Sequence, residues 1–130
     1  MSIMSMFKAS EYFQAGVAGA PVTDWTLYDT HYTERFLGDP VENKEGYTKS
    51  SVFPYATELS GPLLIYHGMA DDNVLFRNST KLYKVLQDNN IPFFVMDYPG
   101  KKHSFSGKKT SMHRLNLVRG FFDLHFGLKR

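Results

Sequence analysis

The sequence contains no cysteine, which excludes disulfides and thiolate metal sites and leaves the redox compartment open. It also has no apolar run near the roughly 18–20 residues that span a bilayer. The segment Met1–Phe7 lacks the basic stretch and the small-residue cleavage site of a secretory signal. A periplasmic or membrane-anchored location would therefore require a signal upstream of residue 1, and the sequence leaves the location unknown.

The sequence has little excess charge. Its formal net charge is +2, which is too small to indicate a nucleic-acid partner. The basic stretch at residues 101–109 has no basic helix face and no aromatics spaced for base stacking, so we expect a solvated loop there and no nucleic acid. With 42% apolar and 15% aromatic residues, the 130-residue chain can fill one core, and no linker divides it.

Three short apolar segments have the length and composition of buried strands, and segments with helical spacing separate them. The predicted strands are Phe13–Val22, Leu63–Tyr66 and Phe93–Tyr98. The predicted helices are Met1–Ser10, Asp24–Phe36, Leu75 to about Asn89, and Leu115–Phe126. We expect Gly38–Ser51 to be a loop or one short helical turn. Strands that alternate with helices predict an α/β fold with a parallel sheet and crossover helices.

An acidic corner follows the second predicted strand, and a histidine follows the third. Because ligands of parallel sheets lie beyond the carboxyl ends of the strands, Asp71 and His103 can reach one crevice. In α/β-hydrolases the catalytic residues occur in the order nucleophile, acid, histidine, and this pair fits the last two places. We predict that His103 is a general base and that Asp71 fixes its tautomer. The nucleophile motif G-x-S-x-G is absent from the 130 residues.

Other assignments of this corner remain open. Asp72 is adjacent to Asp71, and the sequence does not decide which carboxylate points at His103. We expect His67 to support the loop by hydrogen bonding and not to take part in catalysis. A zinc or manganese site built from these four residues lacks any compact ligand signature, so we predict no metal and no other cofactor.

An aromatic group precedes the second strand. Trp25, Tyr28 and Tyr32 are spaced by three and four residues, which predicts that they share one face of a helix. From the residues alone, ordinary core packing is the favoured interpretation of this face.

Several strings together resemble a known family. They are A-P-V-T-D-W at 20–25, Y-T-E-R at 32–35 and H-G-M-A-D-D-N-V at 67–74, followed by the His103 loop. In one register, and over nearly the whole chain, they are similar to the C-terminal part of the catalytic domain of the prolyl oligopeptidase family of serine peptidases, in its dipeptidyl peptidase IV branch.

The resemblance implies the C-terminal portion of an α/β-hydrolase fold and a serine-type peptidase that cleaves after proline near peptide N-termini. It favours Asp71 over Asp72 as the triad acid, and His103 as the base. It implies that Asn73 binds a main-chain carbonyl of the peptide substrate. It also implies a pocket for the side chain before the scissile bond, lined by Val22, Trp25, Tyr28, Tyr32 and Val74.

The chain departs from this family in what it lacks. The family's nucleophile motif G-W-S-Y-G-G and its N-terminal β-propeller are absent, and Met1 would fall a few residues after the serine. We therefore expect residues 1–130 to be a single partial domain, inactive without the N-terminal part of the same protein.

Family members often dimerise through the C-terminal region, and the final helix, with Phe121, Phe122, His125 and Phe126, is a candidate surface. A helix that docks on its own core would have the same sequence pattern.

Two competing functions remain open at the level of the sequence. An esterase or acyl-peptide hydrolase would share the Asp–His order, although we would not expect it to combine Asn73 with the Trp25, Tyr28 and Tyr32 pocket. A non-catalytic interaction module is the alternative from a different class. An upstream G-x-S-x-G would separate the enzymes from the module.

Overall fold

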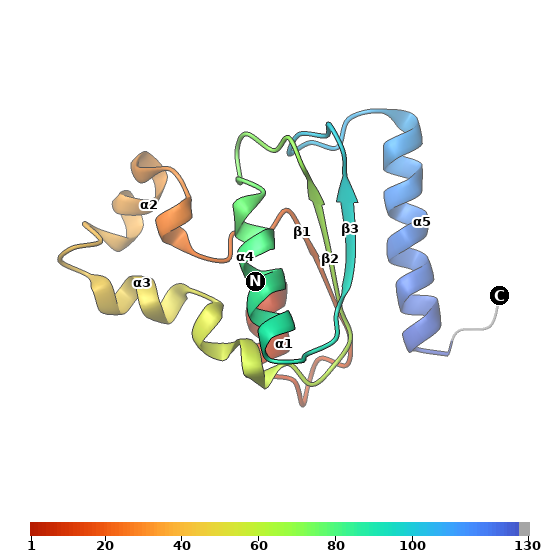
Figure 1. Ribbon diagram of the computed structural model, residues 1–130, viewed down its shortest axis with the longest axis horizontal. Helices are drawn as coiled ribbons and strands as arrows, with labels where there is room; N and C mark the ends of the chain where they lie inside the picture. Colours follow the sequence, from red (N-terminus) through yellow and green to blue (C-terminus); the bar gives the residue numbers. More distant parts are fainter. Residues whose placement is uncertain (128–130) are drawn as a thin grey trace.

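The computed structural model describes residues 1–127, which form a parallel three-stranded sheet flanked by helices (Figure 1). The strands are β1 (Gly16–Gly19), β2 (Leu63–Gly68) and β3 (Phe94–Tyr98), and they lie in the order β1-β2-β3. The α-helices are α1 (Ser2–Lys8), α2 (Thr30–Leu37), α3 (Lys44–Ser50), α4 (Arg77–Asp88) and α5 (Lys108–His125). Two 3₁₀ helices are η1 (Trp25–Leu27) and η2 (Phe53–Glu58). The predicted parallel α/β architecture is confirmed.

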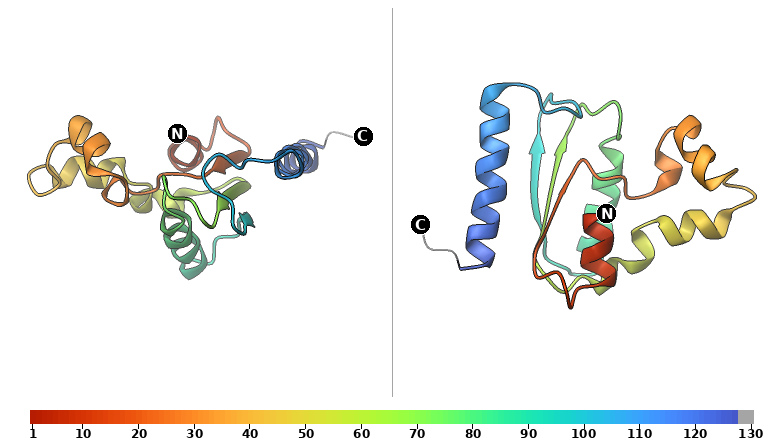
Figure 2. Two further views of the ribbon diagram at one scale, coloured as in Figure 1. Left: turned by 90° about the horizontal axis from the view of Figure 1, so that it is seen from above. Right: turned by 180° about the vertical axis from the view of Figure 1, so that it is seen from behind.

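Helices cover both faces of the sheet. Seen from above, α1 and α4 lie on one side of the strands and α5 lies on the other (Figure 2). On the α5 side, Leu64 is buried, and the ring of Phe121 packs edge-on against that of Phe94 at 5.5 Å. Within residues 1–127, no helix combines the length and the apolarity that crossing a bilayer would require.

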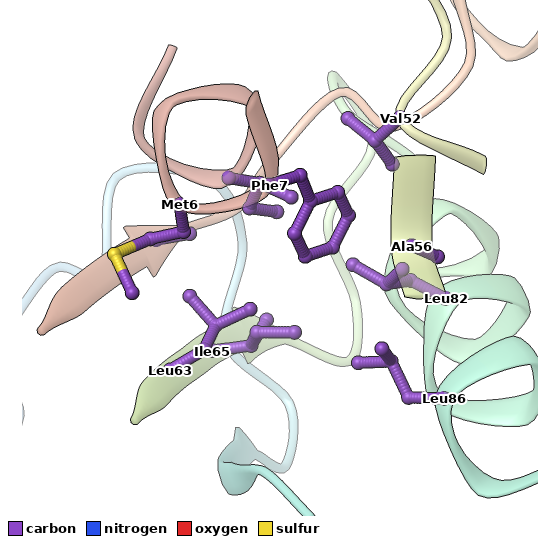
Figure 3. Packing of buried hydrophobic residues seen from close by; sticks show 10 residues of the cluster. Met6, Phe7, Val52, Ala56, Leu63, Ile65, Leu82 and Leu86 are labelled. Atoms are coloured by element: carbon purple, nitrogen blue, oxygen red, sulfur yellow. The ribbon is translucent and has the colours of Figure 1, made fainter. Parts of the chain in front are cut away.

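The main core lies between the sheet and the helices α1 and α4. Leu63 and Ile65 of β2 point into it and are fully buried, and side chains from α1, α4 and η2 surround them (Figure 3). Burial of each such side chain contributes about 1.5–3 kcal/mol. Gly16 allows α1 to approach β1 closely, because a Cβ there would lie 2.4 Å from Cγ of Met6. This contact explains why a glycine begins the first strand.

The prediction of one helix over Asp24–Phe36 is wrong. Asp24 accepts a hydrogen bond from the Thr26 amide and begins η1, which ends at Leu27. Asp29 then accepts from the Tyr32 amide and begins α2. Aspartate caps helices well because its carboxylate satisfies an amide of the first turn. Two caps five residues apart therefore divide the segment into two helices.

The segment between α2 and β2 contains more helix than predicted. Gly38–Ser51, predicted to be a loop or one short turn, includes the seven-residue helix α3, which Asn43 caps by accepting from the Gly46 amide at 3.0 Å. In Figure 1, α2 and α3 project away from the sheet as an excursion between β1 and β2. The strand β1 (Gly16–Gly19) is also shorter than the predicted Phe13–Val22. Phe13 lies before the strand and is about half exposed.

The outer edge of β1 generates a testable prediction. The amides of Gly16 and Ala20 point to β2, so the backbone groups of Val17 and Gly19 face away from the only strand that β1 pairs with in residues 1–127. An exposed edge of this kind is a template for pairing with another chain. We predict that the isolated 130-residue chain self-associates or aggregates at micromolar concentration. A monodisperse monomer in light scattering would contradict this prediction.

Candidate active site

Asp71 lies in a tight corner just beyond the carboxyl end of β2. Its side chain is fully buried, and its Oδ1 accepts hydrogen bonds from the amides of Asn73 and Val74, each at 3.0 Å. The Asp71 amide in turn donates to the Gly68 carbonyl at 3.1 Å. The corner therefore wraps around the carboxylate, and the neighbouring backbone fixes its orientation.

The loop after β3 is joined directly to this corner. The amide of Met69 donates to the Tyr98 carbonyl, and the amide of Ala70 donates to the Lys101 carbonyl, each at 3.0 Å. Gly68 makes the approach sterically feasible, because a Cβ there would lie 2.3 Å from the Lys101 carbonyl oxygen.

A buried aromatic anchors the far side of the same loop. Phe105 packs edge-on against the rings of Tyr66 and Tyr98 at 5.3 and 5.5 Å. Together with the contact at Gly68, this anchor holds His103 between two fixed points.

The structure brings Asp71 and His103 together. Nδ1 of His103 lies 2.9 Å from Oδ2 of Asp71, which is a hydrogen bond with the nitrogen as donor. The His103 side chain is 43% exposed, and its other ring nitrogen, Nε2, has no hydrogen-bond partner within residues 1–127. One nitrogen is thus held by a buried carboxylate while the other is available to a hydroxyl group from outside these residues.

Asp72 points elsewhere. Its exposed carboxylate pairs with Lys102, and the hydrogen bond from that ammonium lowers the pKa of Asp72. The geometry therefore favours Asp71 as the partner of His103. Among residues 1–127, no group of three or more histidine and acidic side chains is arranged to hold a metal ion.

The three predicted aromatic residues form one cluster although they do not share a helix. Trp25 lies 5.9 Å from Tyr28 and 6.0 Å from Tyr32, measured between ring centroids, and the two tyrosine rings are 5.6 Å apart. Tyr32 is about half exposed, so the cluster is accessible and is not part of the main core.

A hydrogen bond links this cluster to the acidic corner. The Tyr28 hydroxyl donates to Oδ1 of Asn73 at 2.8 Å. The NH₂ group of the exposed Asn73 has no hydrogen-bond partner among the described residues, so it can donate to another molecule. The corner and the aromatic cluster thus belong to one continuous surface.

The two valines predicted for the pocket lie in different surroundings. Val22 borders an open cavity of ≈ 310 Å³ together with Trp25. Tyr32 and Trp25 border a second cavity, of ≈ 210 Å³. Val74 is buried, and its carbonyl accepts a hydrogen bond from His67 at 2.9 Å. The predicted pocket residues are therefore not gathered in a single cavity within residues 1–127.

A buried polar tie, which the sequence analysis missed, fixes the segment that leads to the cluster. The Thr23 amide donates to Oδ1 of Asn78 at 3.0 Å, and the Thr23 hydroxyl donates to the Asn78 carbonyl at 2.9 Å. Both residues are buried, and the Val52 amide donates to the Thr23 carbonyl. The partners are 55 residues apart, so no local pattern could have indicated the contact.

The fold and the site together define a class of protein. A parallel sheet that carries a buried acid after one strand and a partly exposed histidine after the next is the arrangement of an α/β-hydrolase. Comparison with known proteins agrees with this class. The sequence model of the prolyl oligopeptidase family matches residues 1–129, and the chain belongs to this family of serine peptidases.

Similar proteins include several dipeptidyl peptidases. Human dipeptidyl peptidase 8 is 37% identical over 126 residues, which cover 92% of this chain and 14% of that protein. Human prolyl endopeptidase FAP is 35% identical over 130 residues, covering 95% of this chain and 17% of that protein. The crystal structure of Porphyromonas gingivalis dipeptidyl peptidase 4 matches with a TM-score of 0.92 at 41% identity, covering 95% of this chain and 18% of that chain. The chain thus spans less than a fifth of the length of each.

The tie between Thr23 and Asn78 generates a prediction about stability. Replacing Asn78 by leucine removes the acceptor and leaves the buried Thr23 amide unpaired. Each such group costs roughly 1–3 kcal/mol, so we expect Asn78→Leu to lower the free energy of unfolding by about 2–4 kcal/mol. Thermal unfolding of the protein measures the effect.

The matched control is Asn89→Leu, at an exposed asparagine just after the same helix. We expect it to change stability by less than about 1 kcal/mol. Equal thermal midpoints for the Asn78→Leu variant and the unsubstituted protein would show that the tie is unimportant.

Proposed function

We propose that residues 1–130 are the C-terminal segment of a peptidase catalytic domain and supply the acid and the base of a Ser-Asp-His triad. The observation that carries the proposal is the pair of Asp71 and His103, joined at 2.9 Å, in which Nε2 of His103 has no hydrogen-bond partner among residues 1–127. The serine would come from residues upstream of this chain, in the N-terminal part of the same protein. The short coverage of the relatives supports this division.

The chemistry follows from the two ring nitrogens of His103. Nε2 takes the proton of the serine hydroxyl while the serine oxygen bonds to the peptide carbonyl carbon. Asp71 stabilises the imidazolium through Nδ1. The C–N bond then breaks, and Nε2 returns the proton to the leaving amine. A water molecule cleaves the acyl-enzyme by the same two steps and frees the serine.

The proposed reaction is hydrolysis after proline near the N-terminus of a peptide. The cluster of Trp25, Tyr28 and Tyr32 offers aromatic faces to a compact ring, and Val22 borders a cavity together with Trp25. Val74 would contribute to the pocket from the buried corner next to Asn73. The NH₂ group of Asn73, unpartnered in the part of the chain that the structure describes, is suited to donate to a main-chain carbonyl of the substrate, while its oxygen accepts from Tyr28. Two of the relatives carry the name dipeptidyl peptidase and a third the name prolyl endopeptidase, which supports this specificity.

A second copy of the chain is the proposed partner of α5. Phe121 and His125 face Phe94 of β3 and so dock on the chain's own sheet. Leu115, Leu124 and Phe126 are exposed, at 58%, 68% and 47%, and would supply the contact with the second copy.

The catalytic assignment predicts large losses of activity. In the protein that includes its serine, we expect Asp71→Asn and His103→Ala each to lower kcat by about 10³- to 10⁶-fold. Hydrolysis of a Gly-Pro chromogenic amide measures kcat, and the unsubstituted 130-residue chain should be inactive. Asp72→Asn is the matched control, because Asp72 pairs with Lys102 and not with His103. A loss below tenfold for either triad variant would sink the assignment.

The substrate pocket makes a different kinetic prediction. We expect Tyr28→Ala and Tyr32→Ala to raise KM for the Gly-Pro amide about tenfold, since each removes an aromatic contact worth roughly 1 kcal/mol or more. Their effect on kcat should be smaller, because neither ring contacts His103. Tyr12→Ala, at a tyrosine that is 79% exposed, serves as the control. An unchanged KM in both cluster variants would assign the cluster to packing alone.

A further inference from the structure

A second histidine contacts the same carboxylate as His103. His67 lies in β2, and its side chain is completely buried. Its Nε2 lies 3.1 Å from Oδ2 of Asp71, and its Nδ1 lies 2.7 Å from the Ser79 hydroxyl of α4. The ring of Phe76 packs edge-on against it at 5.5 Å. The imidazole is therefore held on all sides and is closed to solvent.

The contacts of His67 fix which nitrogen carries a proton. Nε2 faces two oxygens, the Asp71 carboxylate and the Val74 carbonyl at 2.9 Å, and neither can donate. Nε2 must therefore be an N–H donor. The Ser79 hydroxyl can donate or accept, so Nδ1 is satisfied in either state of the ring. Ser79 is itself fully buried, which keeps this partner in place.

The Asp71 carboxylate is thus saturated with donors. Oδ1 accepts from two backbone amides, and Oδ2 accepts from His103 at 2.9 Å and from His67 at 3.1 Å. Four hydrogen bonds occupy the lone-pair sites of the two oxygens. Without His67, only His103 would hold Oδ2, and the more exposed of the two rings would orient the carboxylate.

We propose that His67 is a positioning residue for the triad. Its Nε2–H fixes Oδ2 of Asp71 in the direction that receives Nδ1–H of His103, and Ser79 keeps the His67 ring in the required orientation. Within residues 1–127, His67 contacts the Val74 carbonyl, Ser79 and Phe76 besides Asp71, and none of the three rings of the aromatic cluster. Of these partners, Asp71 is the one that contacts His103, so His67 acts on the base through Asp71. An apolar side chain could fill the same space but could not donate. The inference rests on the proposed function, because it presumes that Asp71 and His103 act on a serine.

Two substitutions of His67 by amide side chains test whether the hydrogen bond donated to Asp71 is required, or whether any polar side chain at this position suffices. In the protein that includes its serine, His67→Gln places an NH₂ group near the position of Nε2, whereas the shorter His67→Asn reaches only toward Ser79. We expect His67→Asn to lower kcat for the Gly-Pro amide about 10- to 100-fold, the value of a hydrogen bond to a charged group. KM should stay within about threefold. His67→Gln should recover most of the loss.

Leu82→Ala is the control for stability, since the Leu82 side chain is fully buried in the main core and, being apolar, forms no hydrogen bond with the site. It should destabilise the fold but leave kcat per titrated serine unchanged. The rate of labelling by a fluorophosphonate, which reacts with an activated serine whatever the peptide specificity, provides a second readout.

The outcomes distinguish the two proposals. Labelling without cleavage of the Gly-Pro amide would overturn the proline specificity, and the labelling rates of the His67 variants would still decide the role of His67. Equal rates for the Asn and Gln variants and the unsubstituted protein would overturn the positioning role, as would a change in KM alone. Absence of labelling in the unsubstituted protein would overturn both proposals.

Discussion

The arrangement of the site depends on one buried charge, the carboxylate of Asp71. A carboxylate with no contact to water must receive hydrogen bonds on both oxygens, because leaving it unpaired costs several kcal/mol. Two backbone amides of the corner and two imidazoles meet this requirement. The tight turn after β2 and the approach of the loop after β3 are therefore conditions for burying the charge.

The same constraint explains why glycine stands at position 68. The Lys101 carbonyl occupies the space where a side chain would begin, and the Ala70 amide donates to that carbonyl. The close approach of the loop after β3 to the corner after β2 therefore depends on the glycine at the end of β2. The buried Phe105 completes the arrangement by holding the loop beyond His103. His103 is consequently positioned by the backbone on both sides and by Asp71 at its ring.

The parts of the structure that follow periodic patterns were predictable from the sequence. The alternation of apolar strands and helices predicted the parallel sheet, and its carboxyl edge placed Asp71 and His103 in one crevice. Single residues with local but strong effects were missed. The caps Asp24, Asp29 and Asn43 divided one predicted helix and created another, although the preference of Asp and Asn for caps was available as a signal.

Contacts between distant residues could not be predicted in this way. The tie between Thr23 and Asn78 and the contact of His67 with Ser79 join segments that approach only after the sheet has formed. His67 was expected to support its loop by hydrogen bonding, but its bond to Asp71 required the ring orientation, which the sequence does not contain.

The central claim is that a buried Asp71 holds His103 with its proton on Nδ1 and leaves Nε2 to act as the base. Nitrogen NMR of the histidine rings, in the protein that includes its serine, tests it most directly. The account predicts that neutral His103 is the Nδ1–H tautomer and that Asp71→Ala abolishes this preference. A neutral His103 that carries its proton on Nε2 in the unsubstituted protein would contradict it.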